Sequence, residues 1–535
     1  MVSFAIARRR APDPESPSPS FMLFSSWQFL FLFLPAALLV FVLIPTRLHV
    51  LRKAWLLAAS LVFYGYWKVE YVPLLLLSIA FNYAIAEIIS RSASQRRSRL
   101  ALIAGVSANL LLLGYYKYTN FGAAFLSSIM RRELGRFDVV LPLAISFFTF
   151  TQIGYLADVY RDKKLHYGTL DYGLFVALFP HLIAGPIVRH WEVIPQFARR
   201  DWKATRADLE VGAAMFLLGL YKKVLLADSA APYANLIYGA AEAGTRLTFF
   251  DGWLGTLAYY LQIYFDFSGY SDMAIGLARM FGIRFPLNFD SPYRAASIID
   301  FWRRWHITFQ RFLREYLYYP LGGNRCSSVR HAFNLMVTML LSGLWHGAGW
   351  TFIVWGGLHG FYLLIAHRWR VFVKARGWVF PHWSYRAMCF LLTFAAVLFA
   401  WIFFRANSLT VALHIAASMT GRYGLAIPGN HATLNAPLAR RMAKLGIRFV
   451  LDPAPAYSRA IAAWTLAVSL LIAWFTPNTQ QLLRAHQPAL EPVERPSRWR
   501  MPLNAISGLV LGGLFFGVLR SYYLARPNPF IYFHF

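Results

Sequence analysis

Residues 331–367 read HAFNLMVTMLLSGLWHGAGWTFIVWGGLHGFYLLIAH and contain no Lys, Arg, Asp or Glu. One helix of that length would extend over about 55 Å, far beyond the roughly 30 Å core of a bilayer. The segment therefore predicts two helices that turn at 343–350, where three glycines and two tryptophans surround His346. Each arm would have about 14 to 17 residues, slightly too few to cross the whole core.

The predicted turn places His346 inside the membrane. Non-helical backbone is tolerated at that depth only where it lines a cavity or is packed in protein. We therefore expect His346 at a cavity floor or in a tunnel wall. Ionisable groups in such places are commonly functional. A packed histidine bonded to a backbone carbonyl is the alternative that the residues leave open.

The rest of the chain also indicates a membrane protein. Of 535 residues, 58% are hydrophobic and only 14% charged, which argues against a disordered chain, a disulfide scaffold or a soluble enzyme. We predict an all-α polytopic protein with about 10–12 transmembrane helices plus re-entrant and interfacial pieces. The apolar stretches lie near 29–45, 51–67, 72–89, 100–116, 140–156, 172–188, 210–227, 252–268, 333–366, 386–404, 460–475 and 504–520.

Basic residues outnumber acidic ones by 53 to 24, a net charge of +29. They occur as short runs between apolar stretches, for example at 47–53, 91–99 and 199–206. This pattern is typical of cytoplasmic loops and of contacts with anionic lipid, not of a nucleic-acid interface. On this topology the N-terminus is external, so the three arginines at 8–10 violate the positive-inside rule. We expect 1–21 to be a non-native or dispensable extension and 22–535 to form one membrane domain.

A second motif, FWRRWHITFQRFLREY at 301–316, predicts an interfacial amphipathic helix. At 100° per residue one face carries Trp302, Trp305, Phe309, Phe312 and Tyr316, and the opposite face carries Arg304 and Arg311. His306 lies at the edge of the aromatic face and can point into the protein. Simple packing is the interpretation that the aromatic residues by themselves favour.

A third motif, YFDFSGYSDM at 264–273, places Asp266 and Asp272 at the end of an apolar span. Carboxylates there need partners, and Arg279, Arg284, Arg303 and Arg304 are the candidates. We favour a structural polar network over a role in activating a histidine. The spacing of His, Cys and carboxylate residues predicts no metal site, and the glycines predict no dinucleotide site.

These motifs together resemble the membrane-bound O-acyltransferase family, and most closely its alginate O-acetylation branch. The resemblance is carried in order by MLFSSWQF (22–29), FPHLIAGPIVR (179–189), YFDFSGYSDMAIGLARMFG (264–282), DFWRRWHIT (300–308), YLYYPLGGNR (316–325), SGLWHGAG (342–349) and FIYFHF (530–535). It implies a ring of helices around a thinned centre with a funnel or tunnel. It also implies that His346 is catalytic and that His306 is the family's upstream histidine. The stretches 421–459 and 484–502 match no part of the pattern.

The resemblance implies acetyl transfer from a cytoplasmic thioester donor such as acetyl-CoA, a co-substrate, with no bound cofactor. Basic loops would attract the donor's phosphates. His346 would act as general base, and His306 would orient the acceptor or stabilise the oxyanion. Ser342, one helical turn before His346, keeps a covalent acyl-enzyme open. The residues expected to line the tunnel are Trp345, Trp305, Asp266, Ser268, Tyr270, Asp272 and Ser342.

The expected acceptor is an exported polysaccharide such as alginate or cellulose, reached directly or through a periplasmic acetyltransferase partner. The expected location is the bacterial inner membrane. Peptidoglycan acetylation is similar chemistry, whereas D-alanyl transfer to teichoic acid is a weaker match. A transporter or flippase for a lipid-linked sugar is the alternative from another class, but it predicts two pseudo-symmetric halves, and the sequence shows no such repeat. A non-catalytic membrane scaffold is the third alternative.

Overall fold

The computed structural model describes residues 22–163, 167–378, 382–428, 447–450, 456–493, 495, 498–524, 530 and 531. The proposed extension at 1–21 lies outside these residues, as do most of the C-terminal motif at 530–535 and the middle of the 421–459 stretch.

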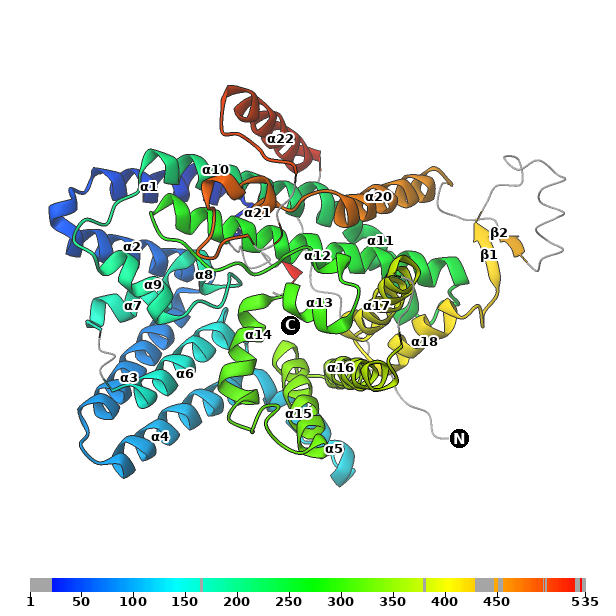
Figure 1. Cartoon of the computed structure of the whole chain (residues 1–535), viewed down its shortest axis with the longest axis horizontal. Helices are drawn as coiled ribbons and strands as arrows, with labels where there is room; N and C mark the ends of the chain where they lie inside the picture. The colour runs from blue at the N-terminus through cyan, green and yellow to red at the C-terminus, as the bar shows by residue number, and fades with distance from the viewer. Residues whose placement is uncertain are drawn as a thin grey trace.

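The described part of the chain is almost entirely helical (Figure 1). Its first part contains α1 (Leu34–Leu43), α2 (His49–Gly65), α3 (Val72–Arg91), α4 (Gln95–Leu113), α5 (Thr119–Met130), α6 (Ile145–Arg161), α7 (Thr169–Ala177), α8 (Phe179–Leu182) and α9 (His190–Ala198). Its centre contains α10 (Arg206–Tyr221), α11 (Asp228–Glu242), α12 (Phe249–Met280), α13 (Ile298–Arg304), α14 (Ile307–Leu313), α15 (Ser328–His346) and α16 (Trp350–Arg376). Its last part contains α17 (His382–Arg405), α18 (Leu409–Met419), β1 (Leu425–Pro428), β2 (Ile447–Val450), α20 (Ala456–Phe475), α21 (Thr479–Leu482) and α22 (Ala505–Leu524). The two short strands pair in parallel within the 421–459 stretch.

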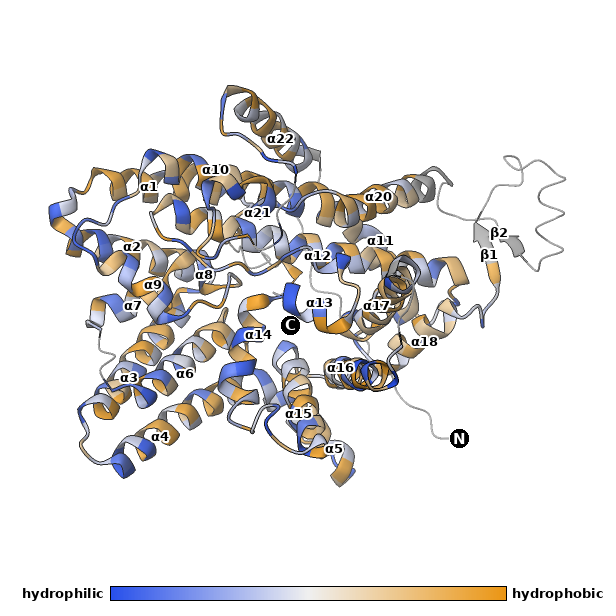
Figure 2. Ribbon diagram, viewed as in Figure 1, coloured by the Kyte–Doolittle hydropathy of each residue, from blue (hydrophilic) through white to orange (hydrophobic). Residues whose placement is uncertain are grey.

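Several helices are suited to cross a membrane. Within the described residues four helices are long and apolar enough, at Val69–Arg91, Gln95–Met130, Trp383–Arg405 and Ala505–Tyr523. A pair bent by 111°, Phe29–Leu43 with Thr46–Gly65, makes a fifth candidate. Figure 2 shows hydrophobic residues along peripheral helices such as α4 and α22, which is the composition that lipid contact requires. The other apolar stretches form shorter or more polar helices than the sequence predicts.

Helix α12 runs through the middle of the molecule and packs along α10 (Figure 1). Glycines allow this close approach. A Cβ atom added to Gly219 of α10 would lie 2.6 Å from the carbonyl oxygen of Gly269 of α12, and one at Gly212 would lie 2.6 Å from the carbonyl oxygen of Gly276. Small residues let membrane helices approach backbone to backbone. Helix α12 is therefore buried along most of its length.

The predicted helical hairpin is present, and its turn falls at 347–349 between α15 and α16. The arms, however, have 19 and 27 residues, so the predicted short arms are wrong. Both helices continue into the basic residues that flank the apolar segment, because charged side chains at a helix end still accept helical geometry. The arms touch closely where Gly343 of α15 faces the carbonyl of Phe352 and Gly356 of α16 faces that of Met339.

The predicted single helix at 301–316 is wrong, because the chain breaks at its centre. Helix α13 ends at Arg304, and α14 begins at Ile307. Between them His306 adopts left-handed backbone angles, φ 45° and ψ 54°. Few residues other than glycine and asparagine adopt this conformation readily. The break turns His306 into the protein, where it is completely buried.

Candidate active site

Two buried histidines from different parts of the chain come together. His346 is the last residue of α15, and His306 occupies the break between α13 and α14. Their ring centroids lie 6.5 Å apart. Exposed fractions of 0% for His306 and 3% for His346 remove both from bulk water. The structure thus brings together the two residues that the sequence predicts as catalytic.

Aromatic rings enclose this pair. Phe309 lies against both histidines, with its ring centroid 4.9 Å from that of His306 and 5.5 Å from that of His346. Trp355 meets His346 edge to face at 5.1 Å, and Phe267 of α12 meets His306 in the same way at 4.7 Å. Among the described residues neither ring nitrogen of His306 has a hydrogen-bond partner. Buried polar atoms normally have one, so a reacting group or water fits this position.

The unusual backbone of His306 is fixed by Asn288, in the segment after α12. The Asn288 side-chain oxygen accepts a hydrogen bond from the Thr308 hydroxyl at 2.9 Å, and its backbone oxygen accepts one from the Ile307 N–H at 2.9 Å. Its amide group donates to Ser271 of α12 at 3.0 Å. The His306 turn is therefore held directly to the α12 wall.

The 484–502 stretch, which matched no part of the family pattern, covers the segment that carries Asn288. The Leu287 N–H donates to Glu491 at 2.9 Å, and Arg495 donates to Asp290 at 2.6 Å. Arg311 of α14 bridges Glu491 and Glu192 of α9. Burial raises the pKa of the Glu192 carboxyl, although the Arg311 guanidinium opposes this shift. These ion pairs tie the stretch to the helices beside His306.

Asp266 and Asp272 form structural ion pairs, as the sequence analysis favoured, but the expected arginine partners are wrong. Asp266 pairs with Lys223 at 2.9 Å and also accepts from the backbone N–H of Ile531 at 2.8 Å. Asp272 pairs with Lys222 at 2.5 Å and accepts from Gln480 at 2.6 Å. Both lysines belong to the π-helical segment η5 (Lys222–Ala227) that continues α10. The close α10–α12 contact, which no sequence pattern indicated, selects these partners.

The other residues expected in the tunnel wall are buried. Trp345 stacks on Phe309 with centroids 4.4 Å apart, and Trp305 stacks on Phe301. Tyr270 lies between two aromatic neighbours, Phe24 and Phe530, at 4.6 and 4.4 Å. Ser268 and Ser342 are buried, and their hydroxyls have no hydrogen-bond partner among the described residues. Their place in a tunnel stays a prediction.

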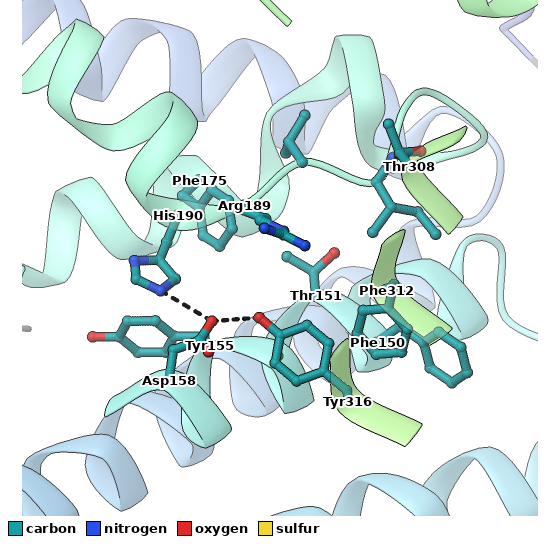
Figure 3. Close-up of a pocket in the computed structure, with 13 residues that line it drawn as sticks. Phe150, Thr151, Tyr155, Asp158, Phe175, Arg189, His190, Thr308, Phe312 and Tyr316 are labelled. Atoms are coloured by element: carbon teal, nitrogen blue, oxygen red, sulfur yellow. Dashed lines mark hydrogen bonds and ion pairs between the residues drawn. The ribbon is translucent and has the colours of Figure 1, made fainter. Parts of the chain in front are cut away.

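A small pocket with a cavity volume of about 20 Å³ lies between α6, the residues before α9, and α14, and is lined by Thr308 on the side of His306. Figure 3 shows His190 and Tyr316 both pointing at Asp158 on one side of it. Phe150 and Phe312 stack 4.7 Å apart at its other end. Phe150 in turn lies 5.4 Å from Trp345. A single aromatic layer thus separates the pocket from the residue next to His346.

Sequence reasoning missed four residues of this region. His359 of α16 is completely buried beside Trp355, with ring centroids 4.8 Å apart. Asn288 carries no charge and sits in an ordinary loop, so no sequence signal marks it. Lys117 and its neighbour Tyr118 lie directly after the predicted 100–116 span, where a cation is usually an interfacial residue. In the structure both side chains contact the end of α15.

Comparison with known proteins agrees with the fold. The family model described as the membrane-bound O-acyltransferase family matches residues 160–412, which include both histidines. A peptidoglycan O-acetyltransferase of Helicobacter pylori is 36% identical over 96% of this chain and 98% of its own length. A probable alginate O-acetylase AlgI of Azotobacter vinelandii is 43% identical over 74% of this chain and 78% of its own length. A teichoic acid D-alanyltransferase of Streptococcus thermophilus is 30% identical over 42% of this chain and 57% of its own length.

These similarities confirm the resemblance drawn from the sequence motifs and decide against the transporter and scaffold alternatives. The relatives match over most of their own length, and the chain has several apolar helices long enough to cross a membrane. The chain belongs to the membrane-bound O-acyltransferase family and is a multi-pass membrane O-acyltransferase.

Proposed function

We propose that this protein moves an acetyl group from cytoplasmic acetyl-CoA to a hydroxyl of an exported cell-envelope glycan at the bacterial inner membrane. The observation that carries the proposal is the pair of buried histidines, 6.5 Å apart and enclosed by aromatic rings. Acyl transfer to a hydroxyl needs a base and a group that stabilises the oxyanion, both shielded from competing water. The pair offers two such groups in one dry site.

In this mechanism His346 is the general base. Its neutral imidazole takes the proton from the attacking hydroxyl while the oxygen bonds to the thioester carbonyl carbon. The tetrahedral intermediate then expels the thiolate as the carbon–sulfur bond breaks, and the His346 imidazolium returns its proton to the sulfur. His306 donates a hydrogen bond to the developing oxyanion or holds the acceptor hydroxyl. Ser342 lies one turn before His346 and would be the nucleophile of a two-step variant.

The donor would enter from the cytoplasmic side at the pocket beside Asp158 and His190, which must widen from about 20 Å³ to admit a thioester. It opens next to α9, which is followed by the basic run at 199–206. Arg189 and Arg161 lie at this side of the molecule, the former over the Trp191 ring at 4.8 Å. Positive charge there would attract the phosphates of coenzyme A. The Phe150–Phe312 stack at the inner end would have to part, or be passed, before the thioester reached His346.

The acceptor is proposed from the relatives, whose names combine acetyl transfer with peptidoglycan in one case and alginate in another. Both are exported glycans with free hydroxyl groups, so this class is the proposed destination, and cellulose belongs to it. The acetyl group would reach the polymer directly or through a periplasmic partner transferase. The D-alanyltransferase relative covers less than half of this chain and supports the reaction class only.

The test combines deletion of the gene in its native host with purified protein in detergent. We expect deletion to remove acetyl groups from one exported glycan, and the purified protein to release free coenzyme A from acetyl-CoA. His346→Ala should abolish both at normal protein level, whereas Cys389→Ala, in a membrane helix away from the pair, should change neither. Full acetylation in the His346→Ala strain would overturn the assignment. Comparing acetyl content of muropeptides with that of secreted polysaccharide would identify the acceptor.

A further inference from the structure

The last carbonyl groups of α15 need hydrogen-bond partners from elsewhere in the protein. The last carbonyls of a helix have no partner within the helix and must be satisfied from outside. The Gly347 N–H reaches only the carbonyl of Gly343, and the chain then turns away in extended conformation. The carbonyls of Leu344, Trp345 and His346 are left over. They lie in a partly buried region of the protein, where an unmade hydrogen bond is costly.

Two adjacent side chains from another helix satisfy all three carbonyls. The Lys117 ammonium donates to the Trp345 oxygen at 2.5 Å and to the His346 oxygen at 3.2 Å. The Tyr118 hydroxyl donates to the Leu344 oxygen at 2.7 Å. Both belong to the π-helical segment η4 (Gly114–Tyr118) between α4 and α5. Such segments recur at functional sites because they redirect neighbouring side chains.

The same helix face holds the other side of the turn. Phe121 and Phe125 follow Lys117 at intervals of four residues, so the three share one stripe of the η4–α5 helix. Both phenyl rings pack edge to face on Trp350, the first residue of α16, at 5.6 and 5.7 Å. Lys117, Phe121 and Phe125, together with the adjacent Tyr118, form what we call the turn clamp. The turn clamp therefore contacts both ends of the turn that follows His346.

A lysine ammonium in this part of the protein costs free energy unless other groups compensate its charge. No ion pair to Lys117 is found within the described residues. Its charge is instead compensated by the negative end of the α15 helix dipole and by the Trp345 ring, whose centroid lies 5.9 Å away. A cation therefore binds the end of the helix that carries His346 more firmly than a neutral donor would.

We propose that Lys117 is a positioning residue for acyl transfer: with Tyr118 it fixes the end of α15, and thereby the His346 ring, in the geometry that the reaction needs. The proposal rests on the proposed role of His346. Lys117 does not touch the reacting atoms, since its contacts are to backbone oxygens. Misplacing a catalytic group by about 1 Å can cost about 100-fold in rate. The turn clamp should thus govern turnover and leave donor binding unchanged.

The experiment uses the full chain in detergent with acetyl-CoA as the probe. We expect Lys117→Met to lower kcat about 10- to 100-fold with the KM for acetyl-CoA changed less than about twofold. Lys117→Arg, which keeps the charge and the donors, should recover most of the loss. Tyr118→Phe should show a smaller loss of the same kind. Lys163→Met is the matched control, because Lys163 also donates to a backbone oxygen, that of Ser92 at 2.8 Å, away from the turn.

A double-mutant cycle separates positioning from general stability. In a His346→Ala background the Lys117→Met change should cause no further loss of the residual rate, because its effect passes through His346. An equal further loss there, or full kcat in the single Lys117→Met variant, would overturn the proposal. If the Lys117→Met protein does not accumulate, Tyr118→Phe and Lys117→Arg take its place in the double-mutant cycle with His346→Ala. Wild-type protein inert toward acetyl-CoA would count against the proposed donor, and the same variants would then be scored by acetylation of the glycan in cells.

Discussion

The rings of His306 and His346 lie 6.5 Å apart, although one residue ends a helix and the other interrupts one. His346 is the last helical residue of α15 and directly precedes the Gly347–Gly349 turn. His306 owes its place to the left-handed backbone between α13 and α14. A regular helix through position 306 would direct its ring elsewhere.

The left-handed backbone of His306 allows its ring to be tested apart from its turn. Asparagine tolerates this conformation better than alanine does. We expect His306→Asn to fold like the wild type and to lose acyl transfer about 10²- to 10³-fold, the range for loss of a group that stabilises the oxyanion. His306→Ala should lose activity equally and also roughly 1 kcal/mol of stability. Acetyl-CoA turnover and the detergent melting temperature are the two measurements. A fully active His306→Asn protein would show that the His306 imidazole takes no part in acyl transfer.

Asn288 should affect both stability and catalysis, because it holds the His306 turn to α12. Asn288→Ala removes the acceptor for the Thr308 hydroxyl and the donor to Ser271. We expect a cost of about 1–3 kcal/mol and a fall in kcat. Asn82→Ala is the control, since Asn82 makes an equally buried pair with Asn109 away from the site. The control should melt earlier but keep its kcat, and an equal fall in kcat for both variants would contradict the proposed link to His306.

The Lys223–Asp266 pair should behave as structural charge. Both side chains are almost fully buried, at 3% and 2% exposed. Lys223→Met alone leaves the buried Asp266 carboxylate without its cation and should cost about 3–5 kcal/mol, whereas Asp266→Asn leaves Lys223 paired with Asp228 and should cost less. The double variant should recover part of that loss, although Asp228 also pairs with Lys223 at 2.7 Å and limits the recovery. Melting curves of the four proteins supply the comparison. A double variant that is folded but inactive would instead point to a catalytic role for Asp266.

Two adjacent glycines of α16 differ sharply in what they permit. A Cβ atom on Gly356 would collide with the backbone of Met339, whereas one on Gly357 would make an ordinary 3.6 Å contact with Leu340. We expect Gly356→Ala to separate the α15 and α16 arms at a cost of about 1–3 kcal/mol and to displace His346. Gly357→Ala should be neutral or slightly stabilising. The measurements are the expression level, melting temperature and turnover of the two variants. Equal values for Gly356→Ala and Gly357→Ala would show that the α15 and α16 arms can move apart freely.

The sequence by itself determined the class of the molecule and predicted which residues carry the chemistry. The uncharged 331–367 segment is too long for one helix, so a turn at His346 followed from bilayer dimensions alone. The same reasoning could not supply the arm lengths, because a helix does not end where its apolar residues end. Helical periodicity also predicted one continuous helix at 301–316 and could not detect the break at His306.

Tertiary structure alone decided what holds those residues in place. The break at His306 depends on Asn288, and the end of α15 depends on Lys117, both far from the histidines along the chain. The partners of Asp266 and Asp272 are lysines of η5, because α10 and α12 meet at glycines and bring those side chains within reach. Local sequence encodes helix, turn and charge through short-range sterics and hydropathy. The acceptor of a particular hydrogen bond or charge is set by which distant segments pack together, and short-range patterns do not carry that information.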